Sequence, residues 1–471
     1  MAVALGPLAN IPLDVVREVF THGIIYGMTV DDKEDRAELR TNISMVCRQW
    51  REIALTTPLL WSLVYISLAR PPSHESLELA LARSGTQNLD ITIRSEGCDA
   101  DEESGLATKA MKLLTPHIRR WKLIHITLDD LVNVKEVVSS HFRGTADALD
   151  EIFLCSEPES TSDPYAEVVL HPTFVAPKLR VFVLYDIALM KGSARLPKHF
   201  PALDELSLVR SSFSEAPGAN WPKLMGILKN FKNLRSFNYG LDSEDADDDD
   251  DDDGDGDDED DEGDDEANID VSSLPSLPAL EELIVHYMNL RGINKLLGAF
   301  TAPRLSKLEI ASYQSADDEE ERLPKTKALL GRFPSLGTLR FDDSAEAFDI
   351  ENVQYLADGL ERLEVANVDL EPLLQMFTKR VARSKRPIPR LKSLELHSEK
   401  VVPVSALRKL VEACATAGHA IESAAVHTTA ECPKDDLSWF EGNLQNFNWT
   451  SVSDTYAAVW GSVTLLYGPK A

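Results

Sequence analysis

Hydrophobic residues recur along most of the chain in one repeated pattern. A block of the form Leu-x-x-Leu-x-Leu, in which x varies, begins every 24–31 residues, with one longer interval. The clearest blocks begin at Leu149, Leu179, Leu203, Leu234, Leu280, Leu305, Leu336, Leu360 and Leu391, and weaker ones at Trp121 and Ile421. Short runs in which apolar and other residues alternate are typical of β-strands, so the pattern predicts one strand in each repeat.

The segments between the blocks follow a different period. Residues 224–231, 290–300 and 404–414 carry apolar side chains at spacings of three and four. This spacing places the apolar side chains on one face of a helix. A strand followed by a helix in each repeat predicts an α/β fold with a parallel sheet.

The residues between the Leu positions of each block are expected on the opposite face of the sheet. Side chains alternate sides along a strand, so these residues should lie on an open surface when the Leu side chains point to the core. The candidate target-binding residues on this surface are Val183, Tyr185, Ile284, His286, Arg340 and His397. Three of them are apolar at positions that should face solvent, which favours contact with a partner. Cover by a neighbouring loop is the alternative.

Residues 89–430 resemble a leucine-rich repeat array, because Leu recurs at fixed strand positions with a helical pattern after the strand. The resemblance implies an α/β solenoid with a parallel sheet whose open face binds other macromolecules. In this family an Asn or Cys usually follows the strand and bonds the backbone of adjacent coils, but most copies here lack it. We therefore expect an irregular array. An independent α/β sandwich is the alternative fold.

Residues 10–62 have a different organisation, that of a short all-helical module. A helix should begin at residues 11–14, because Pro12 suits the first turn and Asp14 faces the positive end of the helix dipole. A second helix is predicted over residues 41–55, with Thr57-Pro58 ending it and an alternating strand over residues 61–66. Two or three such helices bury little apolar area by themselves, so they need a partner.

Three sequences of this module, IPLDVVREVF, VCRQWREIA and TPLLW, occur in the order found in F-box modules, which the chain resembles in the form common in fungi. The resemblance implies docking on the Skp-type adaptor of a cullin ubiquitin ligase. By that resemblance, the residues that make or support the contact are Ile11, Pro12, Val15, Val16, Val19, Phe20, Val46, Cys47 and Trp50. The alternative is that these side chains pack against the next domain of the same chain.

The charge of the chain is concentrated in one segment. The sequence has 48 basic and 78 acidic residues, for a net charge of −30, but residues 242–266 alone contain 20 acidic residues and no basic one. We predict a disordered acidic insert over residues 242–268, which divides the array into residues 63–241 and 269–450. Neither the insert nor the remainder is basic enough to favour nucleic acid or an anionic membrane as a partner. Residues 379–386 form a basic cluster that is a nuclear import signal, a dock for the chain's own acidic segment, or a solvated helix end and loop.

No motif in the sequence indicates catalysis. The five cysteines form no CxxC pair, the histidines fit no zinc-protease motif, and there is no phosphate-binding glycine loop. We therefore expect neither an enzyme nor a bound metal or cofactor. The N-terminus lacks the features of a signal peptide, and no apolar run is long enough to span a bilayer. A cytoplasmic or nuclear location is expected.

The sequence therefore predicts a substrate-recognition adaptor of an SCF-type ubiquitin ligase. The module over residues 10–62 would dock on the Skp-type adaptor, the array would hold an unknown target protein, and residues 451–471 would form a cap or tail. The chain is expected to be a monomer before assembly. Two alternatives stay open: a chaperone for basic proteins such as histones, and an adaptor-binding protein that does not direct ubiquitination.

Overall fold

The computed structural model describes residues 11–25, 33–156, 167–189, 196–209, 221–240, 274–286, 293, 296–311, 332–342, 361–366, 370–383, 391–398 and 402–451. The acidic insert at 242–268, the tail after residue 451 and the end of the basic cluster at 384–386 lie outside these residues. The chain forms two compact units, residues 1–203 and 204–462. Across the described residues, no helix combines the length and apolar character needed to cross a bilayer.

The chain begins with helices, as predicted, but the second predicted helix is two. The elements are α1 (Leu13–Ile25), α2 (Lys33–Val46), α3 (Arg48–Thr56) and the short 3-10 helix η3 (Pro58–Trp61). Cys47 separates α2 from α3 because its backbone is extended, with φ −155° and ψ 169°. Its Sγ accepts a hydrogen bond from the backbone N–H of Trp50 at 3.4 Å, which caps α3. The predicted continuous helix over residues 41–55 is therefore wrong at Cys47.

These helices pack around a small core of their own. Phe20 of α1 and Trp50 of α3 meet edge to face with ring centroids 4.8 Å apart. The indole N–H of Trp61 donates to the Ala54 carbonyl at 2.8 Å, which holds η3 against α3. The buried residues of this core are Phe20, Ile43, Ile53, Ala54, Leu60 and Leu63. Part of the apolar stripe predicted from the sequence is thus used inside the helical segment.

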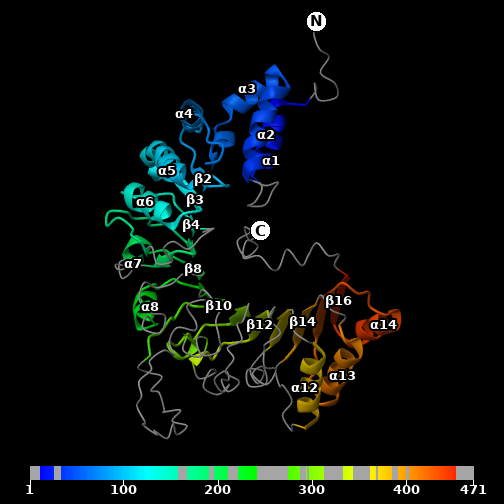
Figure 1. Cartoon of the computed structure of the whole chain (residues 1–471). Helices are drawn as coiled ribbons and strands as arrows, with labels where there is room; N and C mark the ends of the chain where they lie inside the picture. Colours follow the sequence, from blue (N-terminus) through cyan, green and yellow to red (C-terminus); the bar gives the residue numbers. More distant parts are fainter. Residues whose placement is uncertain are drawn as a thin grey trace, which may run out of the picture. The chain divides into compact units, whose positions relative to one another are not determined.

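The rest of the first unit is a parallel sheet with helices packed beside it. Its strands β1 (Leu63–Ser67), β2 (Leu89–Arg94), β3 (Trp121–Leu128), β4 (Glu151–Ser156) and β6 (Val181–Tyr185) pair in parallel in this order. The helices are α4 (His74–Arg83), α5 (Ala100–Leu114), η4 (Thr115–Arg120), α6 (Leu131–His141) and α7 (Leu196–His199). Figure 1 shows α4, α5 and α6 following one another along one side of β2–β4. The short strands β5 (Glu167–Val168) and β7 (Ala188–Leu189) pair separately.

The second unit repeats this organisation. Its parallel strands are β8 (Glu205–Val209), β9 (Ser236–Gly240), β10 (Glu282–His286), β11 (Lys307–Ala311), β12 (Thr338–Asp342), β13 (Arg362–Ala366), β14 (Ser393–Ser398), β15 (Ser423–Thr428) and β16 (Asn446–Ser451), each paired with the next. The helices are α8 (Trp221–Leu228), α12 (Leu370–Arg383), α13 (Val404–Thr416) and α14 (Lys434–Asn443). The α/β fold with parallel strands paired in chain order confirms the prediction from the Leu blocks.

The block positions form the core as the alternation predicts. The second and third Leu positions of the blocks are buried, for example Leu283 and Val285 in β10 and Leu308 and Ile310 in β11. In the first unit, buried aromatic rings from successive repeats contact one another in a row, at centroid distances of 5.5, 5.2 and 6.2 Å. This aromatic row consists of Trp121, Phe142, Phe174 and Phe200. It fills the space between sheet and helices with large rings, which carry most of the packing energy per residue.

Successive repeats are also tied together by main-chain hydrogen bonds just before the strands. In the second unit, the N–H of the residue before a strand donates to the carbonyl of the equivalent residue in the preceding repeat. The bonds of this main-chain ladder run from Glu281 to Arg235, Ser306 to Glu281, Gly337 to Ser306, Glu361 to Gly337, Lys392 to Glu361, Glu422 to Lys392 and Gln445 to Glu422, at 2.7–3.0 Å. The coils therefore keep a continuous register although most copies lack the expected Asn.

Candidate docking surface and charged sheet face

Exposed apolar side chains are concentrated on the N-terminal helices. Among the described residues, the large apolar side chains that remain exposed there are Ile11, Leu13, Val15, Val19, Met45, Val46 and Leu55, whereas Leu79, Val132 and Val169 are the ones exposed elsewhere. Val19 is 61% exposed, Val46 60% and Met45 68%. Exposed apolar residues that gather in one small module mark a surface for contact with a partner.

The apolar stripe of α1 divides between the core and the solvent. Val16 and Phe20 pack into the helical core. Val15 and Val19, which immediately precede them in the sequence, are exposed. Pro12 begins the helix by accepting the N–H groups of Val15 and Val16 at 3.0 and 3.2 Å. Helical geometry thus lets one sequence stripe fold the module and still present an apolar face.

The predicted adaptor-binding residues therefore fall into two groups. Ile11, Pro12, Val15, Val19 and Val46 are exposed and available for contact. Val16, Phe20, Cys47 and Trp50 are buried or half-buried and support the exposed ones from behind. The exposure of the first group argues against the alternative in which the whole stripe packs against the next domain of the same chain. Packing of that kind would have covered these side chains. We call the exposed group together with Leu13 and Met45 the apolar docking surface.

Charged residues border the docking surface. Arg17 pairs with Asp14 at 2.8 Å on the outer turn of α1. The guanidinium of Arg51 donates to the Ser44 carbonyl at 2.8 Å and so fixes the angle between α2 and α3 beside Met45 and Val46. An apolar centre with a charged rim is the usual composition of a protein–protein interface.

The sheet face of the second unit carries a row of alternating charges. Lys307 lies 2.8 Å from Glu282 and 3.1 Å from Glu309, and Arg340 lies 3.4 Å from Glu309 and 3.9 Å from Glu364. Arg362 continues the row, at 2.7 Å from Glu364 and 2.6 Å from Glu395. We call Glu282, Lys307, Glu309, Arg340, Glu364, Arg362 and Glu395 the charged ladder. Strand register produces it, because all of these residues occupy the first or third position of their strands.

Removing Arg340 should test how strongly the charged ladder holds the sheet. The Glu309 side chain is only 4% exposed, and loss of Arg340 would leave Lys307 as the remaining Lys or Arg paired with its carboxylate among the described residues. We expect Arg340→Ala to lower the free energy of unfolding by about 2–3 kcal/mol. Urea denaturation measures this. Arg235→Ala removes an exposed Arg that pairs with Glu281 and should leave the midpoint unchanged. An equal loss in both variants would contradict a special role for Arg340.

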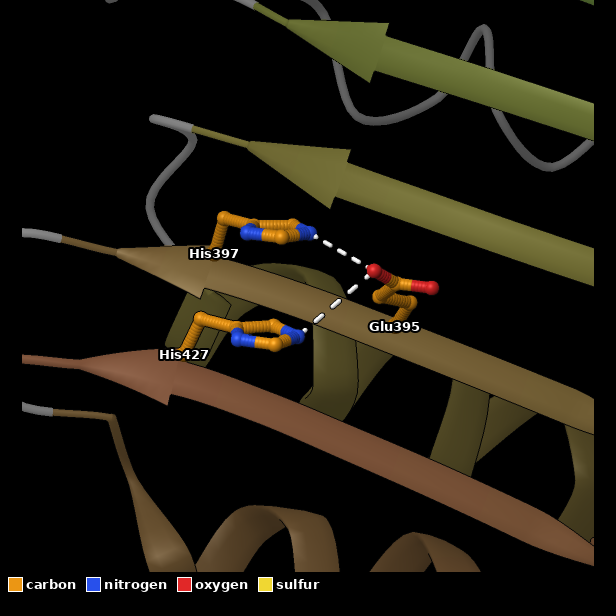
Figure 2. A group of neighbouring side chains, drawn as sticks. All are labelled: Glu395, His397 and His427. Atoms are coloured by element: carbon orange, nitrogen blue, oxygen red, sulfur yellow. Dashed lines mark hydrogen bonds and ion pairs between the residues drawn. The ribbon is translucent and has the colours of Figure 1, made fainter. Parts of the chain in front are cut away.

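At the end of the charged ladder, two histidines face the same carboxylate. The Nε2 of His397 lies 3.0 Å from Oε1 of Glu395, and the Nε2 of His427 lies 3.6 Å from the same oxygen. Figure 2 shows the two rings lying parallel on adjacent strands and pointing toward Glu395, with centroids 4.3 Å apart. The hydrogen bond from His397, together with Arg362, lowers the pKa of Glu395 to about 2, against the opposing effect of burial. The pKa of His427 is lowered mainly by burial and to a smaller extent by the charge of His397.

A shallow hollow of about 670 Å³ adjoins this end of the charged ladder. Its lining includes Arg362, Glu395, Asn446 and Asn448, so polar groups of β13, β14 and β16 reach it. It is large enough for a side chain or a small ligand and lies wholly within the second unit.

Three predicted target-binding residues lie inside the protein. Val183 is 1% exposed, Ile284 7% and His286 4%, so the expectation that they face solvent is wrong. In-register neighbours on adjacent strands contribute to this: Phe153 beside Val183, and Asn238 and Glu309 beside Ile284. Tyr185, Arg340 and His397 are half-buried at the sheet face and remain candidates.

His286 has a close neighbour that the sequence pattern did not indicate. It pairs in register with Gly240 of β9, where a Cβ atom would lie 3.1 Å from the Cβ of His286. Gly240 therefore provides the room in which the imidazole is buried. Burial lowers the pKa of His286 from 6.5 to about 4, with Arg340 lowering and Glu309 raising it.

The buried imidazole should make stability depend on pH. The folded-state pKa is below that of the unfolded chain, so the unfolded state binds more protons between pH 6.5 and 4. His286 contributes fully to the free energy of unfolding above about pH 6.5. This contribution, up to about 3 kcal/mol, is lost as the pH falls toward 4. Urea unfolding of the wild type and of His286→Gln at several pH values measures it. Equal pH dependence in both proteins would contradict this assignment.

Alternation along the strands placed Lys307, Glu309, Arg362, Glu364 and Glu395 on the open sheet face, although they were not among the candidate target-binding residues. The sequence reasoning missed His427, which follows the weak block that begins at Ile421. A signal was present: His397 and His427 occupy the same position of two successive blocks, 30 residues apart, and so pair in register. No family model matches the chain, and none of the curated proteins is detectably similar to it in sequence.

Proposed function

We propose that the chain is a substrate-recognition adaptor of an SCF-type cullin ubiquitin ligase. The observation that carries the proposal is the apolar docking surface on α1 and the end of α2. It lies on helices whose sequence resembles an F-box, and several residues implied by that resemblance are exposed. An amphipathic helix that presents its apolar side chains to a partner is a common mode of protein recognition.

The parallel sheet supports the second half of the proposal, in which a leucine-rich array holds a target protein. The sheet face of the second unit displays Arg362, which is exposed, and Arg340, Glu395 and His397, which are partly buried; all four can contact a partner through charge and hydrogen bonds. The chain would then act by holding its target near a ubiquitin-charged enzyme, where effective concentration and orientation speed the transfer. No chemical step is assigned to its own residues.

Binding of the purified full-length chain to a purified Skp-type adaptor tests the proposal directly. Calorimetry should show a saturable complex, and addition of the cullin subunit should produce a larger assembly in size-exclusion chromatography. Absence of any complex at micromolar concentrations would overturn the proposal.

Deletion of residues 242–266 separates this function from the alternative of a chaperone for basic proteins. The deletion removes 20 acidic residues and leaves the N-terminal helices unchanged. Adaptor binding should persist in the deletion variant. If histone binding is strong and disappears with the deletion while the adaptor never binds, the chaperone function is correct.

A further inference from the structure

The charged ladder alternates in sign from Glu282 to Glu395, and then the alternation stops. Each carboxylate before the last lies within ion-pair distance of a Lys or Arg on a neighbouring position. Glu395 meets Arg362 through Oε2, but its other oxygen, Oε1, faces two imidazoles. The described part of the ladder contains four carboxylates and three Lys or Arg side chains. One further cation at Oε1 would complete the alternation.

The strands themselves bring the three side chains together. His397 and His427 pair in register between β14 and β15, and Glu395 lies two residues before His397 on the same side of β14. All three therefore project from the regular sheet rather than from a loop. Their side chains are 21%, 16% and 28% exposed for Glu395, His397 and His427, so the cluster is partly enclosed and still accessible to an ion.

The spacing of the ligand atoms fits a small metal ion. The Nε2 atoms lie 3.0 and 3.6 Å from Oε1, and all three possible ligand atoms lie within 4.8 Å of one another. Zinc–ligand bonds of about 2.0–2.2 Å in a tetrahedral site place the donor atoms roughly 3.3–3.6 Å apart. Both imidazoles already direct their Nε2 atoms toward Oε1 of Glu395 (Figure 2).

The surroundings hold Glu395 in the orientation that this arrangement needs. Arg362 occupies Oε2 at 2.6 Å and is itself neutralised by Glu364 at 2.7 Å. The carboxylate is thereby turned so that Oε1 points to the histidines. Carboxylates that bind metals are commonly held by such a hydrogen bond to the second oxygen.

We propose that Glu395, His397 and His427 bind a Zn²⁺ ion on the sheet face of the second unit. Two imidazole nitrogens and one carboxylate oxygen form a donor set that suits zinc, and three protein ligands leave a fourth position for water. The hollow lined by Glu395 adjoins the proposed site. The site is independent of adaptor docking, because the N-terminal helices contribute no residue to it.

Metal binding is measured on the full-length chain after treatment with a chelator. Zn²⁺ is titrated in competition with a chromophoric zinc indicator, and Co²⁺ is used as a spectroscopic probe, because tetrahedral Co²⁺ absorbs visible light far more strongly than octahedral Co²⁺ bound to oxygen ligands. The wild type should bind one ion tightly with a tetrahedral Co²⁺ spectrum. His397→Asn and His427→Asn should each bind at least about 100-fold more weakly, because loss of a direct ligand should exceed the effect of a supporting residue.

His125→Asn is the matched control. His125 contacts Glu151 through Nε2 at 2.6 Å on the first unit's sheet, where a single imidazole faces a carboxylate. This variant should bind zinc like the wild type. Circular dichroism of the chelated proteins checks folding, and Glu395→Gln, a conservative change, replaces either histidine variant that fails to fold.

Two results would overturn the proposal. In the first, the wild type shows no tight site and no tetrahedral spectrum, and the histidines serve only as hydrogen-bond partners of Glu395. In the second, a tight site persists in the His397, His427 and Glu395 variants, so that thiols or the acidic segment at 242–266 hold the ion. Neither result affects the test of adaptor binding, which uses a different surface and a different measurement.

Discussion

Substituting Asp for Val19 should strongly weaken binding to a Skp-type adaptor while the chain remains folded. Val19 is 61% exposed on α1 and is one of the most exposed residues of the apolar docking surface. In the complex, the carboxylate would be buried in an apolar contact without a partner. Interface centres of this kind contribute 2 kcal/mol or more, so we expect affinity to fall at least about 30-fold. Calorimetry with the purified adaptor measures the change.

Val132→Asp is the control for this substitution. Val132 is 49% exposed on α6, so the variant makes the same chemical change at a similarly exposed helical position outside the docking surface. Asp and Val have similar helix propensities, and neither variant should unfold its helix. Adaptor binding should survive in Val132→Asp. Equal affinities for the two variants would show that α1 does not carry the contact.

The second large effect is expected in the aromatic row of the first unit. Phe142 is fully buried and its ring contacts Trp121 and Phe174, at centroid distances of 5.5 and 5.2 Å. Phe142→Ala would leave a cavity between β3, α6 and the following repeat. We expect it to lower the free energy of unfolding by about 3–5 kcal/mol.

Urea unfolding followed by circular dichroism measures this loss. Leu79→Ala is the comparison, since Leu79 is 46% exposed on α4 and its truncation should cost within about 0.5 kcal/mol. Phe142→Leu keeps most of the volume and should recover much of the stability. A Phe142→Ala variant as stable as Leu79→Ala would mean that the aromatic row does not hold successive repeats together.

The pattern of apolar residues was sufficient to predict the α/β class and the strands of the repeats. The reason is physical: the Leu positions of the blocks lie in the core, so burial and sequence period agree, as at Leu283 and Leu308. The break at Cys47 could not be predicted in this way. Its apolar spacing fits a continuous helix, and only the backbone geometry, with Sγ capping the next helix, separates α2 from α3.

Exposure on the sheet face was the weakest part of the prediction. Alternation shows which side of a sheet a residue takes, but how much solvent reaches it depends on the neighbouring strands. Ile284, Glu309 and Arg340 occupy equivalent positions on three successive strands, yet Ile284 and Glu309 are buried, whereas Arg340 is only partly buried. The convergence of Glu395, His397 and His427 likewise needed the register between β14 and β15, which no single block specifies.

The main-chain ladder has a consequence for how such a protein can change over evolutionary time. The bond from Glu281 to Arg235 is 2.8 Å long although 46 residues separate the two, including the whole acidic segment. Because main-chain atoms are common to nearly all residue types, mutations before the strands leave these bonds in place. Long surface insertions also cost little free energy when the ends are held together. Repeats of this chain can therefore acquire new segments, and with them new partners, without losing their alignment.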